Sequence, residues 1–268
     1  MSGVENPGVG VITTALRRPH TYVGQLREAM GIARAVAAYP RGFFESKITC
    51  GSPRGDVVHD TPVLLVHGFG HNRSAWMVLE RHLRKAGFSN VHTLNYNPLL
   101  QDVPEIAARL KERVELLRAI TGAPRVHLVG HSLGGLVIRW FVQELGGSAM
   151  VDTAITVASP HQGTLAALGA APFGKTAKQL LPGSDVITRL NSRPLAKAAP
   201  GVRWVAFYSN LDLLVQPGLS GKLDGAVNVL VKDHGHLSIL LSIKVARSIM
   251  EQLEASEGAG CPVARIAA

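Results

Sequence analysis

Three residues have the types and the chain order that acyl chemistry at a serine requires: Ser132, Asp212 and His236. Ser132 stands in the pattern G-x-S-x-G at 130–134. Glycines on both sides of a serine let the backbone turn sharply between a strand and a helix, so that the hydroxyl projects from a sheet edge. A serine attacks a carbonyl carbon when a base accepts its proton and a carboxylate orients that base. We therefore predict a nucleophile, a carboxylate and a base.

The residues around the serine supply the context that this pattern needs. Glycine and serine are common in loops, so G-x-S-x-G alone is weak evidence. Here an apolar strand candidate at 126–129 precedes the pattern, and a helix candidate at 133–145 with one apolar face follows it. The backbone N–H of Leu133 would then lie at the positive end of a helix. This position predicts Leu133 as a donor to a developing oxyanion.

A second oxyanion donor is expected after another strand. Residues 61–66 form a continuous apolar run, typical of a strand buried on both faces, and run into His67-Gly68-Phe69-Gly70 at 67–70. The backbone N–H of Phe69 is the predicted second donor, because one donor leaves an oxyanion half satisfied. His67 and His71 do not predict a metal site, since no cysteine or carboxylate cluster accompanies them.

The carboxylate and the base each have rivals in the sequence. Asp224 precedes a predicted strand and would lie at the wrong sheet edge, and Asp233 is too close to His236 in the chain to orient its ring. Asp212 follows a strand candidate, as Ser132 does, and is therefore preferred. His236 is preferred to His234 because it directly precedes the closing helix, where its ring can overhang the sheet edge.

Strand and helix candidates alternate along the chain, which predicts parallel pairing with right-handed crossovers. We expect one α/β domain with a mostly parallel central sheet and helices on both faces. Sites in such sheets lie at the carboxyl ends of the strands. The strands are predicted at 61–66, 91–96, 126–129, 152–158, 202–208 and 226–231, and the helices at 75–86, 102–121, 133–145 and 237–253.

The predicted domain organisation has three parts. Residues 1–60 form an N-terminal extension, 61–256 the catalytic domain and 257–268 a tail. Within the domain, 165–200 is rich in Ala, Gly, Pro and Leu, which indicates an insertion outside the core. We prefer an apolar cap over the serine to a plain surface excursion.

The N-terminal extension contains a predicted amphipathic helix at 22–38. Tyr22, Leu26, Met30, Ala33 and Ala37 fall on one stripe at helical spacing. Such a stripe is expected to pack against the body of the domain. The alternative is a helix that lies on a lipid surface.

Net charge and the distribution of apolar residues limit the kinds of partner that this protein could bind. The 268 residues carry a net charge of +9, which favours anionic surfaces such as lipid headgroups, but the charges are scattered without interleaved aromatics, so we do not predict nucleic-acid binding. No apolar run is long enough to span a bilayer. Glu5 precedes the first apolar run and the arginines follow it, the reverse of a secretory signal. We expect a cytoplasmic or membrane-peripheral protein. We also expect Cys50 and Cys261 to be free thiols in preference to a disulfide.

The motifs together resemble bacterial lipases and esterases of the α/β-hydrolase superfamily, in particular the triacylglycerol lipase group. The resemblance covers about residues 60–254. One piece, S-P-H-Q-G-T, departs slightly from the G-T-P-H-x-G usual in the family. The motifs are H-G-F-G at 67–70, G-H-S-L-G-G at 130–135, S-P-H-Q-G-T at 159–164, N-L-D-L-L-V-Q-P at 210–217 and G-H-L-S-I-L at 235–240.

This resemblance implies the α/β-hydrolase fold and hydrolysis of lipid carboxylic esters. It implies Ser132 as the nucleophile, Asp212 and His236 as its partners, and Phe69 and Leu133 as the oxyanion donors. The resemblance implies no cofactor. Some relatives bind a structural calcium, but this sequence shows no clear pair of calcium ligands, so we expect no metal. Two alternatives stay open, an acyltransferase that uses the same acyl-enzyme and a non-catalytic lipid-binding homologue.

Overall fold

Six apolar stretches of the chain form one parallel sheet in the order β2-β1-β3-β4-β5-β6. The structure is a computed structural model that describes residues 19–43 and 59–258. Cys50, Cys261 and most of the predicted tail at 257–268 lie outside the described residues. The strands are β1 (Val63–Val66), β2 (Val91–Leu94), β3 (Val126–His131), β4 (Val151–Val157), β5 (Arg203–Ser209) and β6 (Val227–Val231).

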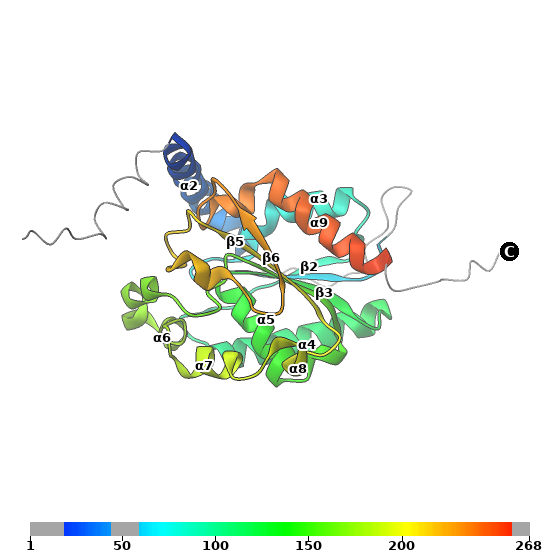
Figure 1. Cartoon of the computed structure of the whole chain (residues 1–268). Coiled ribbons are helices and arrows are strands. Elements are labelled where there is room, and N and C mark those ends of the chain that lie inside the picture. The colour runs from blue at the N-terminus through cyan, green and yellow to red at the C-terminus, as the bar shows by residue number, and fades with distance from the viewer. Residues whose placement is uncertain (1–18, 44–58, 259–268) are drawn as a thin grey trace, which may run out of the picture.

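Helices cover both faces of this sheet, as predicted (Figure 1). Side chains alternate between two buried clusters: Val63 and Leu65 of β1 pack toward α3 and α9, and Leu64 and Val66 pack toward α4 and α5. Burial on both faces explains why β1 is apolar without interruption, and β3 is buried along its whole length although it contains His127 and His131. The helices are α3 (Met77–Lys85), α9 (Ile243–Gly258), α4 (Val103–Thr121) and α5 (Leu133–Glu144).

Local sequence sets the ends of α4. The Asp102 side chain accepts the N–H of Glu105 at 3.0 Å, and the Glu105 carboxylate accepts the N–H of Asp102 at 2.8 Å. This reciprocal pair satisfies backbone donors that the helix itself leaves unpaired. Gly122, with φ 71°, ends the helix in the left-handed conformation. The helix predicted at 102–121 therefore forms almost as expected.

The sheet topology brings the predicted site residues to one edge. The chain leaves β1 to build β2 on one side, and then returns to place β3 on the other side of β1. The loops that follow β1 and β3 leave the same edge of the sheet, at the carboxyl ends of these strands, where open α/β sheets carry their sites. The loops after β5 and β6 end at the same edge because every strand is parallel.

The segment 165–200 differs from the expected insertion. Its helices lie on the same side of the sheet as α4 and α5 (Figure 1), and Leu180, Ile187 and Leu190 are buried in the cluster that those helices share. Only its first part exposes large apolar side chains, so a cap over the serine stays a prediction for that part. The elements are η4 (Leu165–Gly169), η5 (Ala171–Phe173), α6 (Lys175–Gln179), α7 (Asp185–Asn191) and α8 (Leu195–Ala198).

A buried arginine of α5 fixes this segment to the domain. Arg139 Nη2 donates to the carbonyl of Leu190 at 2.7 Å and to Asn191 Oδ1 at 3.0 Å, while its Nε donates to Gln143. Burial lowers the pKa of Arg139 to about 10, so the side chain is still charged at neutral pH. A charge-assisted hydrogen bond of this kind is stronger than a neutral one. These contacts attach the second half of 165–200 to the body of the domain.

The N-terminal helix forms, but its orientation is the reverse of the expected one. In α2 (Pro19–Ala38) the predicted stripe is exposed: Tyr22 by 61%, Leu26 by 65% and Met30 by 50%. The buried positions are Gly24 and Gly31. Small residues let the helix backbone approach its neighbours closely. The face of α2 that carries these glycines therefore packs against the domain, and the apolar stripe is exposed to solvent. No helix in the ranges 19–43 and 59–258 could cross a bilayer.

Candidate active site

Ser132 occupies a strained turn between β3 and α5. Its φ of 52° and ψ of −119° lie outside the regions that a non-glycine residue prefers. A Cβ on Gly130 would lie 2.6 Å from the backbone carbon of Gly134, and a Cβ on Gly134 would overlap the carbonyl oxygen of Val66. Close packing therefore requires both glycines of the motif: Gly130 lies against the start of α5, and Gly134 lies against the end of β1.

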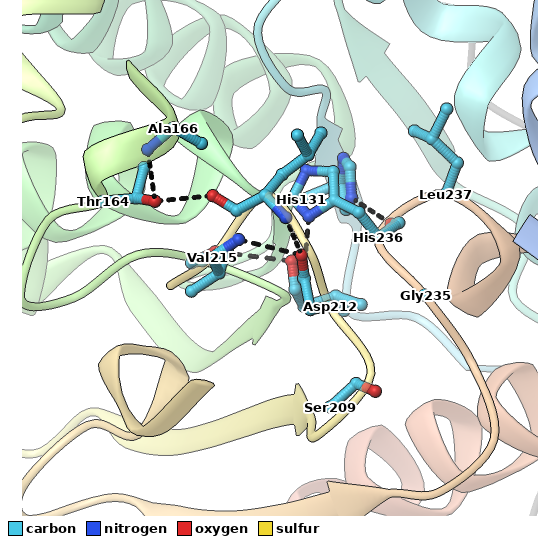
Figure 2. Close-up of polar contacts among 12 residues, drawn as sticks. His131, Thr164, Ala166, Ser209, Asp212, Val215, Gly235, His236 and Leu237 are labelled. Atoms are coloured by element: carbon cyan, nitrogen blue, oxygen red, sulfur yellow. Dashed lines mark hydrogen bonds and ion pairs between the residues drawn. The ribbon is translucent and has the colours of Figure 1, made fainter. Parts of the chain in front are cut away.

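Asp212 and His236 form a buried pair (Figure 2). Asp212 Oδ2 lies 2.8 Å from His236 Nδ1, and its other oxygen, Oδ1, accepts the N–H groups of Leu214 at 2.8 Å and Val215 at 2.9 Å. Because a carboxylate only accepts, Nδ1 carries the proton and Nε2 is left as an acceptor. This is the tautomer that a base at a serine needs.

The rival residues lie elsewhere. His234 Nδ1 donates to the carbonyl of Lys232 at 2.8 Å, so this nitrogen is directed to its own loop. Asp224 is exposed, and Asp233 sits at a left-handed position with φ 61°. The structure thus pairs Asp212 with His236.

His131 joins the serine turn to the loop of His236. Its Nε2 donates to the carbonyl oxygen of His236 at 3.0 Å, and the two rings lie 4.6 Å apart (Figure 2). Burial, followed by the nearby His236 and His71, holds the pKa of His131 well below its usual range. A neutral ring with its proton on Nε2 explains the contact. This role could not be inferred from the sequence, since the pattern G-x-S-x-G leaves the position before the serine open.

The H-G-F-G loop lies beside the serine. A Cβ on Gly68 would lie 3.0 Å from Ser132 Cβ and 2.9 Å from His131 Nδ1. The predicted donors, Phe69 and Leu133, directly follow Gly68 and Ser132 in the chain. Leu133 is the first residue of α5, where backbone N–H groups have no partner within the helix. The two loops are therefore adjacent at the position where an oxyanion is expected.

His67 stabilises this loop rather than a metal. Its Nδ1 donates to the carbonyl of Gly68 at 2.9 Å, its Nε2 accepts the N–H of Tyr96 at 3.3 Å, and its ring stacks on that of Tyr96 at 4.1 Å. Burial lowers its pKa to about 4. Both ring nitrogens are thus used within the protein. Across 19–43 and 59–258, no three His, Cys, Asp or Glu residues are arranged to hold a metal ion.

A third buried histidine belongs to the S-P-H-Q-G-T motif. His161 is fully buried, and its Nε2 lies 3.0 Å from Thr156 Oγ1 on β4. Its backbone N–H donates to the carbonyl of Ser220, and its own carbonyl accepts from Asn191. Burial holds its pKa well below the usual range. The motif therefore has a packing role, tying three segments of the chain together.

Acid is expected to destabilise the fold through His67, His131 and His161. In the unfolded chain each protonates near pH 6.5, whereas the folded protein keeps His67 neutral to about pH 4. Because the unfolded state then binds more protons, the free energy of unfolding falls as pH drops from 6.5 toward 4, by up to about 1.4 kcal/mol per pH unit for each histidine. Urea unfolding at pH 7, 6 and 5 measures this slope.

His67→Asn is the comparison for this experiment. The variant lacks one of the histidines that take up a proton only when the protein unfolds. The slope of its unfolding free energy against pH should therefore be smaller by the contribution of about one proton. An unfolding free energy of the unchanged protein that is the same at pH 7 and pH 5 would contradict the neutral burial of these rings.

Several known proteins that resemble this chain in sequence or in fold are lipases. A triacylglycerol lipase from Burkholderia plantarii is 29% identical over 150 residues, which cover 51% of this chain and 41% of that lipase. The Bacillus licheniformis lipase BlEst2 in its propeptide form superimposes with a TM-score of 0.65 at 18% identity, over 77% of this chain and 54% of that one. The present chain thus spans about two fifths to one half of these relatives.

A shorter relative matches along its whole length. The Paleococcus ferrophilus monoacylglycerol lipase superimposes with a TM-score of 0.56 at 17% identity, over 79% of this chain and 100% of that one. Identities this low establish a common fold. The model of the alpha/beta hydrolase family matches residues 63–242, which is more than half of the sequence and includes every predicted site residue, and the chain therefore belongs to that family.

Proposed function

We propose that this protein is a serine hydrolase that cleaves carboxylic esters of lipids. The observation that carries the proposal is the buried Asp212–His236 pair, which leaves Nε2 of His236 as an acceptor on a loop joined to the serine turn. A strained serine whose turn is joined through His131 to the loop of such a pair is the arrangement expected of an activated nucleophile. The kinship with lipases supports esters as the substrate class.

In the proposed reaction His236 Nε2 takes the proton of Ser132 as the oxygen attacks the ester carbonyl. The N–H groups of Phe69 and Leu133 bind the oxyanion, and Asp212 stabilises the imidazolium. The imidazolium then gives its proton to the leaving alcohol, and an acyl-enzyme remains. Water, deprotonated by His236, attacks the acyl carbon. The imidazolium returns this proton to Ser132 Oγ as the bond between the serine and the acyl group breaks, and the acid is released. Each oxyanion donor contributes on the order of 3 kcal/mol to such a step.

Exposed apolar side chains around the site favour lipid substrates. They lie on loops that follow the carboxyl ends of β2, β4 and β5, the edge that carries the serine. We propose that this rim and the outer stripe of α2 contact a lipid surface, where Arg34 would meet anionic headgroups. The rim consists of Leu99, Leu100, Leu165, Leu168, Leu213, Leu214 and Leu219, each at least half exposed.

Hydrolysis of p-nitrophenyl esters from acetate to palmitate tests this proposal. We expect activity to rise with chain length, and to rise further above the solubility limit of each ester. The double variant Leu26→Ser/Met30→Ser should lose the second increase and keep the rate on dissolved butyrate, because both side chains are exposed. Activity confined to short esters would contradict lipid specificity. Faster product formation with an added alcohol, captured as a new ester, would favour an acyltransferase.

A further inference from the structure

A carboxylate of α2 contacts the backbone directly after His236. Glu28 Oε1 accepts the N–H of Leu237 at 2.8 Å, and Oε2 accepts the N–H groups of Ser238 at 2.9 Å and Leu237 at 3.1 Å. These two residues begin η7 (Ser238–Leu241), so Glu28 satisfies the free donors at the start of that turn. The contact joins residues more than two hundred positions apart, and α2 lies outside the part of the chain that matches the family.

Glycines make this contact possible. A Cβ on Gly31 would lie 2.9 Å from the backbone nitrogen of Ser238, and a Cβ on Gly235 would lie 2.5 Å from Glu28 Oε2. A Cβ on Gly24 would overlap the side chain of Leu211, which precedes Asp212. The inner face of α2 is therefore fitted to both loops that carry the Asp212–His236 pair. In Figure 1 α2 runs beside the orange segment that precedes α9.

The His236 loop is held from two sides. On the inner side His131 donates to the carbonyl of His236 (Figure 2), and the Ser209 hydroxyl donates to the carbonyl of His234. On the outer side Glu28 accepts from the loop, and Arg27 Nη1 donates to the carbonyl of Asp233 at 3.1 Å. The outer contacts come entirely from α2.

We propose that Glu28 is a positioning residue for His236, and that α2 is a working part of the active site. Glu28 acts through the backbone of Leu237 and Ser238, and it touches no reacting atom. This inference rests on the proposed function. Without Glu28 the backbone N–H groups of Leu237 and Ser238 lose this partner, and of the outer contacts named above only that of Arg27 with Asp233 is left. Displacement of a catalytic group by about 1 Å costs on the order of a hundredfold in rate.

Steady-state kinetics of Glu28→Ala on dissolved p-nitrophenyl butyrate tests the proposal. Rates are divided by the concentration of active sites, titrated with a fluorophosphonate, so that misfolded molecules do not count. We expect kcat to fall about tenfold to a hundredfold with KM within about twofold. Glu28→Gln should lie between, since its amide keeps one acceptor oxygen but turns an N–H₂ toward a backbone donor. Gln25→Ala, an exposed position on the same helix, is the matched control and should leave kcat unchanged.

Two outcomes would overturn the role of Glu28. One is an unchanged kcat per active site in Glu28→Ala, whatever happens to its melting temperature. The other applies if the alanine variant fails to fold: Glu28→Gln would then have to keep the full kcat per active site. Ser132→Ala in the same assay separates the two hypotheses. If Ser132→Ala is inactive and Glu28→Ala is not impaired, only the inference about α2 fails, whereas an active Ser132→Ala removes the proposed function itself.

Discussion

Ser132→Ala is expected to lower kcat for ester hydrolysis by at least about 10⁴-fold, because no other group can form the acyl-enzyme. The fold should be unaffected, since the substitution removes one oxygen and keeps the backbone turn that Gly130 and Gly134 make possible. Parallel measurement of kcat and of the melting temperature separates the two effects. Ser74→Ala is the matched control: Ser74 is also buried, and its hydroxyl has no hydrogen-bond partner among the described residues.

A covalent label makes the same test independent of substrate choice. A fluorophosphonate should add its mass to the peptide that contains Ser132 in the unchanged protein, and should add nothing to Ser132→Ala. Full esterase activity retained by Ser132→Ala, or labelling at a different serine, would refute the assignment of the nucleophile.

Local sequence signals predicted the elements that hold the serine. The strand before Ser132 is buried on both faces and mostly apolar, and the turn itself requires the glycines two positions before and after the serine. The ends of α4 likewise depend on Asp102, Glu105 and Gly122, which are neighbours in the chain or nearly so. Such features can be inferred because the interacting atoms are close in sequence.

Features that depend on distant partners could not be inferred in this way. The apolar stripe of α2 indicated a buried face, but the true docking face is a row of small residues whose value lies in how closely they approach the His236 loop. Nothing in the local sequence around Glu28 or around Leu237 indicates that the carboxylate of Glu28 binds the backbone of Leu237. For the same reason 165–200 was expected to be an insertion: its composition is poor in aromatics, and the anchor from Arg139 to Leu190 comes from another helix.

The carboxylate should be nearly as important as the serine. Asp212→Asn is expected to lower kcat by about 10⁴-fold, as the loss of the correct tautomer does in other triads. The N–H groups of Leu214 and Val215 bind one oxygen of Asp212 and will orient the new amide so that its oxygen stays with them. Its N–H₂ then faces His236 Nδ1, which must become the acceptor. The proton moves to Nε2, so the ring can no longer accept the proton of Ser132.

Kinetics of Asp212→Asn and Asp224→Asn side by side test this argument. Asp224 is the exposed carboxylate that sequence left as an alternative, and its substitution should leave kcat within about twofold. Because the tautomer and not the fold is altered, Asp212→Asn should unfold at nearly the same urea concentration as the unchanged protein. A small effect of Asp212→Asn together with a large effect of Asp224→Asn would mean that the buried pair is a packing contact. The base at Ser132 would then have to be oriented by another group.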